Sequence, residues 1–198
     1  MPRRIYLDHA ATTPVAPEVI EAMLPYFQEA WGNPSSIHGF GRQASEGVDD
    51  GRTAVAKLLN CTPKEVYFTA GGTEADNPAI VGAAMAKEEK GRHLITSAIE
   101  HHAVSHTLEA LEKRGWEVTT LPVDNDGLID PAAVRGAIRS DTVLVTIMHA
   151  NNEVGVIQPI AEIGTICREA GVWFHTDAVQ TVGHLPTRVD ELHVDMLS

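Results

Sequence analysis

The chain has 198 residues, of which 43% are hydrophobic and 21% are charged, so it is long enough to bury one sizeable core. Fifteen Lys and Arg residues against 27 Asp and Glu residues give a formal net charge of −12, which opposes binding to nucleic-acid phosphates or to an acidic membrane surface. No apolar run approaches the roughly 18 residues that a membrane span needs, and the first residues lack the apolar core of a signal peptide. We therefore expect a cytoplasmic, globular protein that binds neither nucleic acid nor membranes.

The cysteine content excludes a second set of functions. Cys61 and Cys167 are too few and too far apart in the sequence for a disulfide framework or a cysteine-based metal site. We interpret both as buried or incidental thiols.

The first 64 residues predict a helical arm, because the turn-forming residues 31–36 separate two helix-like segments near 17–30 and 41–59. From residue 65 onward, short β-rich runs alternate with helical segments. These runs cover residues 66–69, 93–99, 116–123, 142–148 and 172–175. Helices are expected between them over 74–90, over 103–114 and from Asp130-Pro131 onward.

This alternation predicts an α/β fold with a mainly parallel sheet flanked by helices. The run 142–148 is apolar on both faces, as expected for a central strand that helices cover on each side. Residues 188–198 resemble the approach to one more strand. We therefore expect two domains, a helical arm over 1–64 and a ligand-binding domain over 65–198.

A candidate anion site lies where the β-rich run 66–69 leads into a helix through residues 70–73 (AGGT). Backbone amides at a helix start point outward with the positive end of the helix dipole behind them, which favours an anion. Gly72 permits a close backbone approach, and the Thr73 hydroxyl adds a donor. The glycine pair is also explained by a strand-to-helix turn alone, and no Walker A lysine follows it.

A candidate carboxylate, Asp177, follows the run 172–175 and should open into the cleft at the end of a central strand. A carboxylate there can keep a pyridine nitrogen protonated, which makes the ring an electron sink. Taken alone, an acid at the end of a strand is also a common cap for the next turn. His175 shares the strand face with Asp177, so a metal pair is a further alternative.

Two more strand ends carry polar side chains. His101 and His102 follow the run 93–99, and an imidazole there can stack on a flat ring and exchange protons near neutral pH. Asn151 and Asn152 follow the run 142–148 and are either turn formers or donors to a ring oxygen. Polar groups at four strand ends suit one flat anionic ligand.

Pyridoxal phosphate is the ligand that these features predict, but it is normally carried covalently on a lysine. The sequence contains no lysine after Lys113. We therefore expect that the reacting lysine lies beyond Ser198.

These segments resemble the class V aminotransferase family of fold-type I pyridoxal-phosphate enzymes, and within it the cysteine desulfurases of the NifS/IscS type. The resemblance covers nearly the whole chain, including residues 6–14 (YLDHAATTP), 32–36 (GNPSS) and 195–198 (DMLS). Residues 151–159 (NNEVGVIQP) resemble the NifS/IscS branch rather than the SufS-like branch.

The resemblance implies a role for each candidate residue. Gly72 and Thr73 would bind the cofactor phosphate, His101 would stack on the ring and assist proton transfer, and Asp177 would pair with the pyridine nitrogen. Asn152 and Gln180 would lie by the phenolic oxygen of the ring. The expected fold is that of the large domain of a fold-type I transferase, with residues 65–198 forming an incomplete pyridoxal-phosphate domain and no metal site.

The resemblance also implies what the chain lacks. The family's Ser-x-His-Lys segment would begin almost immediately after Ser198, and its cysteine that accepts sulfur, its arginine that grips the substrate and its small C-terminal domain would follow. Neither Cys61 nor Cys167 matches that cysteine. We expect the complete protein to be a homodimer that removes sulfur from L-cysteine, leaves alanine and passes the sulfur to a scaffold or carrier protein for iron–sulfur assembly or thiolation. The 198 residues alone are expected to be inactive in that reaction.

Two other functions stay open on the sequence. The first keeps the fold but changes the chemistry, towards selenocysteine lyase, kynureninase-like or aminotransferase activity. The second is a non-catalytic α/β module that binds a phosphorylated ligand or pairs with a chain that supplies the rest.

Overall fold

The computed structural model describes residues 4–198 and divides the chain into two compact units, the first ending at Val66 and the second running from Tyr67 to Ser198. Residues 1–3 lie outside the described residues. They belong to the predicted arm and to the N-terminal segment that lacks the apolar core of a signal peptide. The assignment of residues 1–64 and 65–198 to an arm and a cofactor-binding domain stays a prediction.

The first unit consists of two α-helices, α1 (Pro17–Gln28) and α2 (Gly39–Leu59), and a 3-10 helix, η1 (Pro63–Glu65). Both predicted helices are confirmed with shifted ends. Helix α1 begins with proline, whose fixed φ suits the first helical position. Helix α2 ends at Leu59, and its C-cap residue Asn60 adopts the left-handed conformation (φ 56°) that closes many helices.

The second unit contains five parallel strands: β1 (His93–Ser97), β2 (Glu117–Leu121), β3 (Thr142–Thr146), β4 (Trp173–Thr176) and β5 (Met196–Leu197). Their order in the sheet is β2-β1-β3-β4-β5, so the chain adds β2 on one side of β1 and then returns to the other side for β3. Such a reversal of strand order makes a crevice at the carboxyl ends of the strands. The predicted parallel sheet and its last strand are confirmed.

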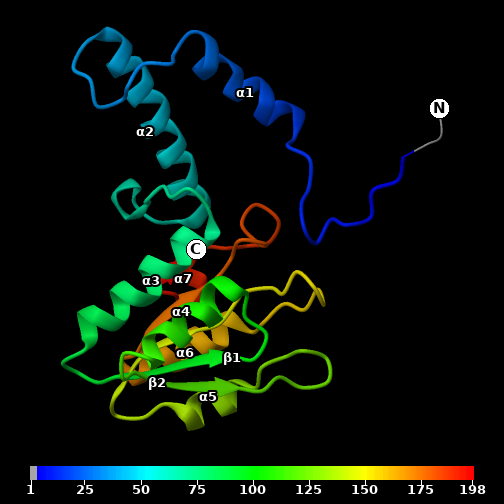
Figure 1. The fold of residues 1–198 in the computed structure, drawn as a ribbon, viewed down its shortest axis with the longest axis vertical. Coiled ribbons are helices and arrows are strands. Elements are labelled where there is room, and N and C mark those ends of the chain that lie inside the picture. Colours follow the sequence, from blue (N-terminus) through cyan, green and yellow to red (C-terminus); the bar gives the residue numbers. More distant parts are fainter. Residues whose placement is uncertain (1–3) are drawn as a thin grey trace. The chain divides into compact units, whose positions relative to one another are not determined.

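Helices connect the strands: α3 (Gly72–Lys87), α4 (His102–Glu112), α5 (Pro131–Ala137), α6 (Ile160–Ala170) and α7 (Val189–Leu192). The predicted Asp130-Pro131 start is confirmed, because Asp130 Oδ1 accepts a hydrogen bond of 2.8 Å from the Ala132 amide. Figure 1 shows α4 above β1 and β2 and α5 below them, in the arrangement expected of a layered α/β domain. Over residues 4–198, the structure shows no helix with the length and apolar character of a membrane span.

One predicted strand is wrong. Residues 66–69 are extended but pair with no strand of the described chain, and the sheet begins instead at β1. Tyr67 and Phe68 are 83% and 54% exposed, so these aromatic side chains are not held on a sheet face. High β propensity makes a strand only where a neighbouring strand completes its hydrogen bonds.

The core consists of two apolar clusters, one on each face of the sheet. Cluster A joins α3 and α4 to the sheet and includes Ile80, Val104, Leu108 and Leu144. Cluster B joins α5 and α6 to the other face and includes Val134, Val145, Ile163 and Phe174. Because β3 alternates its side chains, its neighbours Leu144 and Val145 belong to opposite clusters, which is why the run 142–148 is apolar throughout.

We expect Phe174→Ala to lower the free energy of unfolding of the second unit by about 3–5 kcal/mol, because it empties a fully buried site of β4. Phe174→Leu keeps most of the side-chain volume, so it should lower the free energy of unfolding clearly less than Phe174→Ala does. Urea denaturation of the two variants measures the difference. Equal losses, or a loss below about 1 kcal/mol for alanine, would contradict the described core.

Candidate functional site

Predicted site residues follow three strands at one edge of the sheet. Asp177 comes directly after β4, His101 comes shortly after β1, and Asn152 lies in the segment after β3. Because these strands are parallel, their carboxyl ends point towards the same edge. The backbone fixes this edge, since the His149 amide donates a hydrogen bond of 2.8 Å to the Asp177 carbonyl.

Asp177 is only 6% exposed, and its two carboxylate oxygens have different surroundings. Oδ1 accepts a hydrogen bond of 3.0 Å from the Val179 amide. Oδ2 has no hydrogen-bond partner within residues 4–198, and it is not among the fully buried unpaired oxygens. Burial raises the pKa of Asp177, while the Val179 amide and the nearby His101 imidazole act in the opposite direction. Asp177 therefore offers a nearly buried acceptor to a protonated ring nitrogen.

His101 is the N-cap residue of α4, which fixes the orientation of its ring. Its Nδ1 accepts a hydrogen bond of 3.1 Å from the Ala103 amide, so in the neutral ring the proton is on Nε2. The ring is exposed and lines a cavity together with Thr73. Its effect on the pKa of Asp177 shows that the two side chains are neighbours.

Gly72 and Thr73 open α3, as the sequence predicts for an anion site. The amides of Gly72, Thr73 and Glu74 have no acceptor among the described residues, whereas the next amide, of Ala75, is bonded to the Gly71 carbonyl. A Cβ atom at Gly72 would lie 2.8 Å from Val179 Cγ2, so a larger residue would push against the turn that carries Asp177. The Glu74 carboxylate is bonded to the Ala70 amide.

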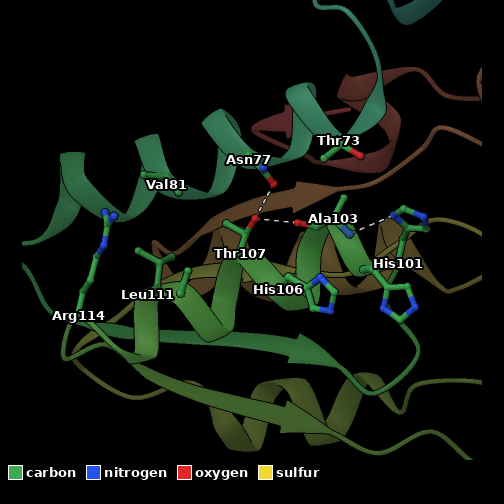
Figure 2. Close-up of a pocket in the computed structure, with 11 residues that line it drawn as sticks. Thr73, Asn77, Val81, His101, Ala103, His106, Thr107, Leu111 and Arg114 are labelled. Carbon is green, nitrogen blue, oxygen red and sulfur yellow. Dashed lines mark hydrogen bonds between the residues drawn. The ribbon is translucent and has the colours of Figure 1, made fainter.

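A cavity of about 520 Å³ lies between α3 and α4. Figure 2 shows Thr73 and His101 at one end of it and Arg114 at the other, with Asn77 and Thr107 in hydrogen-bond contact between them. The lining includes two predicted site residues, Thr73 and His101, but not Asn152, Asp177 or Gln180. The structure therefore brings the predicted residues to one edge without placing all of them around one cavity.

The two predicted amide residues lie on turns. Asn152 is half-buried, and its Nδ2 lies 3.4 Å from Glu153 Oε1. Gln180 is exposed in the turn after β4. That turn is held by Thr181, whose hydroxyl lies 3.0 Å from Nδ1 of the buried His149.

Two alternatives from the sequence are resolved by hydrogen bonds. Asn151 is a turn former, because its Oδ1 accepts from the amides of Glu153 and Val154 and its Nδ2 donates to the Ile99 carbonyl at 2.9 Å. His175 lies 2.8 Å from Thr146 Oγ1 through Nδ1 and 2.9 Å from Ser198 Oγ through Nε2. Both ring nitrogens of His175 are therefore engaged, and the described residues contain no group of three or more side chains that could hold a metal ion.

The sequence analysis did not select two acids of this edge, the buried Asp76 and the half-buried Glu100. Asp76 is 1% exposed on α3, and burial raises its pKa to about 7, with Asp177 adding to the rise and the Ser198 side chain opposing it. Burial raises the pKa of Glu100 to about 8, against hydrogen bonds from Ser97 and the Met148 amide. Asp76 Oδ1 and Glu100 Oε2 are buried without a hydrogen bond among the described residues.

A signal for Asp76 was present in the sequence. The buried positions of α3 are Asp76, Ile80, Ala83 and Ala84, which share one helical face. An acid on an otherwise apolar face is the observation that could have identified it. Glu100 gave only a weak signal, because it lies in a short connection outside any periodic pattern.

The arrangement fits pyridoxal phosphate on three structural features. Unbonded amides at the start of α3 suit a phosphate, and an unbonded oxygen of a nearly buried carboxylate suits a protonated pyridine nitrogen. The exposed imidazole of His101 lines the adjacent cavity. Glu74 adds a negative charge near the amides, but the Ala70 amide already engages its carboxylate.

Known proteins resemble this chain along its whole length. Residues 5–198 match the family model described as aminotransferase class-V. Cysteine desulfurase IscS of Dictyoglomus turgidum is 54% identical over 198 residues, which are 100% of this chain and 50% of that protein. Cysteine desulfurase IscS of Methanosarcina thermophila is 54% identical over 99% of this chain and 48% of that protein. Among solved structures, SspA in complex with cysteine superimposes on this chain with a TM-score of 0.93 and 43% sequence identity. The match covers 98% of this chain and 56% of the SspA chain. The chain thus spans about half the length of the curated relatives it matches.

We expect Glu100→Gln to flatten the pH dependence of stability. The pKa of Glu100 in the folded protein, about 8, lies above its ordinary value of 4.5, so the folded state holds a proton that the unfolded chain releases. This contribution is complete below about pH 4.5 and is lost as the pH rises towards 8. The urea midpoint should therefore decrease less between pH 5 and pH 8 for Glu100→Gln than for the unaltered chain.

The matched control for this prediction is Glu109→Gln on the exposed side of α4, which removes the same formal charge without changing a buried carboxyl group. The decrease in its urea midpoint between the two pH values should equal that of the unaltered chain. If the urea midpoint of Glu100→Gln decreases as much as that of the control, Glu100 is ionised in the folded protein at little cost.

Proposed function

The chain belongs to the class-V aminotransferase family, and on that basis we propose that it forms the greater part of the pyridoxal-phosphate site of a cysteine desulfurase. Enzymes of this family depend on pyridoxal 5′-phosphate. The observation that carries the proposal is the nearly buried Asp177, with Oδ2 unbonded, beside His101 at the carboxyl edge of the sheet. The desulfurase relatives, 54% identical, favour this reaction within the family.

Gly72 and Thr73 are proposed to bind the cofactor phosphate. The unbonded amides of the first turn of α3 supply donors, and the Thr73 hydroxyl supplies another without adding charge. Gly72 keeps the turn that carries Val179 close to these amides. The phosphate would thus be held by backbone groups whose positions the helix fixes.

Asp177 is proposed to bind the pyridine nitrogen. Its Oδ1 is held by the Val179 amide, so Oδ2 is the oxygen that can accept the ring N–H. Pyridoxal phosphate, when bound, supplies an electron sink for the negative charge that develops when the substrate Cα loses its proton. A carboxylate with few competing partners keeps the ring nitrogen protonated and so supports that chemistry.

His101 is proposed to stack on the ring and to move a proton. Because Nδ1 is bonded to the Ala103 amide, Nε2 is the atom available for proton exchange. Its position on the cap of α4 places the exposed imidazole at the cavity, where a flat ligand can reach it.

Asn152 and Gln180 are proposed to lie by the phenolic oxygen of the cofactor. Both have amide N–H groups suited to an oxygen acceptor, and both lie on turns after strands of the same edge. The engaged neighbour Asn151 holds the turn that carries Asn152.

The proposed substrate of the whole protein is L-cysteine. Its C–S bond breaks, the sulfur joins a protein thiolate as a persulfide, and alanine is released. Neither cysteine of this chain is proposed as that thiolate; Cys167 is 1% exposed, and burial raises its pKa to about 12. The proposed partners are a sulfur-accepting scaffold or carrier of iron–sulfur assembly or thiolation and a second copy in a cytoplasmic homodimer.

Selenocysteine lyase or aminotransferase-like chemistry is the nearest alternative, because other members of the family would use the same cofactor groups. A non-catalytic module that binds a phosphorylated ligand is the second alternative. The products that form from L-cysteine distinguish both alternatives from the proposed desulfurase.

The decisive experiment uses a chimera in which residues 1–198 are followed by the part of the Dictyoglomus turgidum relative that this chain does not cover. With pyridoxal phosphate and L-cysteine, we expect alanine and sulfide in equal amounts under a thiol reductant. Asp177→Asn in the chimera should lower kcat/KM by about two to three orders of magnitude, as is typical for a lost charge interaction in the transition state. A chimera that binds the cofactor but forms no alanine would overturn the desulfurase proposal.

A separate prediction concerns the phosphate. We expect Thr73→Val to weaken pyridoxal-phosphate binding by the 198-residue chain by about 3–10-fold, the value of one hydrogen bond, and Thr73→Ser to leave it nearly unchanged. Equilibrium dialysis measures the affinity of each variant. If the valine variant binds as tightly as the serine variant, the Thr73 hydroxyl does not contact the phosphate.

A further inference from the structure

Three acidic side chains, Asp76, Glu100 and Asp177, gather beneath the carboxyl edge of the sheet. They come from α3, from the connection between β1 and α4, and from the end of β4. Asp177 raises the pKa of Asp76, and both aspartates raise the pKa of Glu100, so the three lie within electrostatic range of one another. No lysine or arginine of residues 4–198 forms an ion pair with any of them. Ionising all three carboxylates together without a cation is costly, which favours a protonated form of at least one of them.

Histidine does not neutralise this group in the way that a lysine would. Nε2 of His175 lies 3.7 Å from Asp76 Oδ1, but the ring is fully buried and engages Thr146 and Ser198. Burial lowers the pKa of His175 to about 4, so the ring is neutral at physiological pH. His149 is also buried with a lowered pKa. His101, on the exposed side, affects Asp177.

The hydrogen bonds distinguish the three carboxyl groups. Asp177 has the Val179 amide on Oδ1 and His101 nearby, both of which favour its ionised form. Glu100 has two donors on Oε1, whereas its buried Oε2 has no partner in the described chain. Asp76 is less well supported than Asp177, because its buried Oδ1 has no hydrogen bond among the described residues and faces a neutral imidazole, although the Ser198 side chain favours its ionised form. A buried carboxylate with few donors is costly to ionise.

We propose that Asp76 is a positioning residue that retains a proton in the resting site, so that Asp177 alone of this pair carries negative charge towards the ring nitrogen. The inference rests on the proposed function, because that function assigns Asp177 to the nitrogen. Asp76 then acts through Asp177: a second negative charge on α3 would oppose the ionisation of Asp177, and a neutral carboxyl group does not. The neutral Asp76 lies in the core, with Nε2 of the neutral His175 ring 3.7 Å from its Oδ1.

Carboxyl ¹³C NMR of the 198-residue chain, labelled at aspartate, tests this without any cofactor. In the unaltered chain Asp76 should titrate at least two pH units above its ordinary value of 3.8, and Asp177 should titrate before it. Asp177→Asn should lower the midpoint of Asp76 by roughly one pH unit, because it removes a neighbouring negative charge. Asp76→Asn, which imitates the neutral form, should leave the midpoint of Asp177 within about half a unit.

The reverse pattern would overturn the proposal. If Asp177 is the proton carrier, Asp76→Asn lowers the midpoint of Asp177 and Asp177→Asn leaves that of Asp76 unchanged. An ordinary midpoint for Asp76 in the unaltered chain would overturn it as well, and that measurement needs no variant to fold because through-bond correlations assign the signal. Repeating the titration in the chimera removes the terminal carboxylate of Ser198, and the same order of midpoints is expected there.

The titration is independent of the desulfurase assay. An active chimera with an ordinary Asp76 midpoint would leave the proposed function intact and remove the positioning role. A raised midpoint in a chimera that forms no alanine would leave the proton assignment intact and remove the reaction.

Discussion

The parallel direction of the strands is the constraint on which the site depends. The end of a single strand places one polar side chain at the surface, whereas parallel strands bring several ends to one edge. Asp177, His101 and Asn152 come from three strands, and the reversal of strand order beside β1 opens the crevice there. The two apolar clusters hold the strands in register, so the positions of these side chains follow from the packing of the core.

The same packing imposes an electrostatic cost. Helices on both faces exclude water from the sheet, and Asp76 and Glu100 lie where a charge is poorly solvated. Apolar residues in these places would give a more stable domain. In the proposed site Asp76 keeps its proton close to Asp177, whose charge is supported by the Val179 amide and by His101. Stability and the preparation of the site thus oppose each other at this edge.

Much of the fold could be predicted because its signals are local. Apolar runs and the Asp130 cap mark strand and helix ends through the residues themselves. The strand predicted over residues 66–69 is wrong because pairing with a distant strand, and not β propensity, decides whether an extended segment joins a sheet. Asp177 could be predicted from its place after a strand, but Asp76 could not be selected by a search for polar residues at strand ends, because it lies within a helix.

The turns at the edge show why a site needs side chains that never touch its ligand. Asn151 joins the segment after β3 to the Ile99 carbonyl, and Thr181 joins the segment after β4 to His149. These bonds connect loops that the sheet alone would leave independent, and each lies next to a proposed cofactor residue, Asn152 or Gln180. Sequence patterns give the residue types at such an edge, whereas these bonds between distant segments decide which side chains hold the turns. Asn151 is engaged by the turn that it forms, and the position of Asn152 in the same turn follows from those bonds.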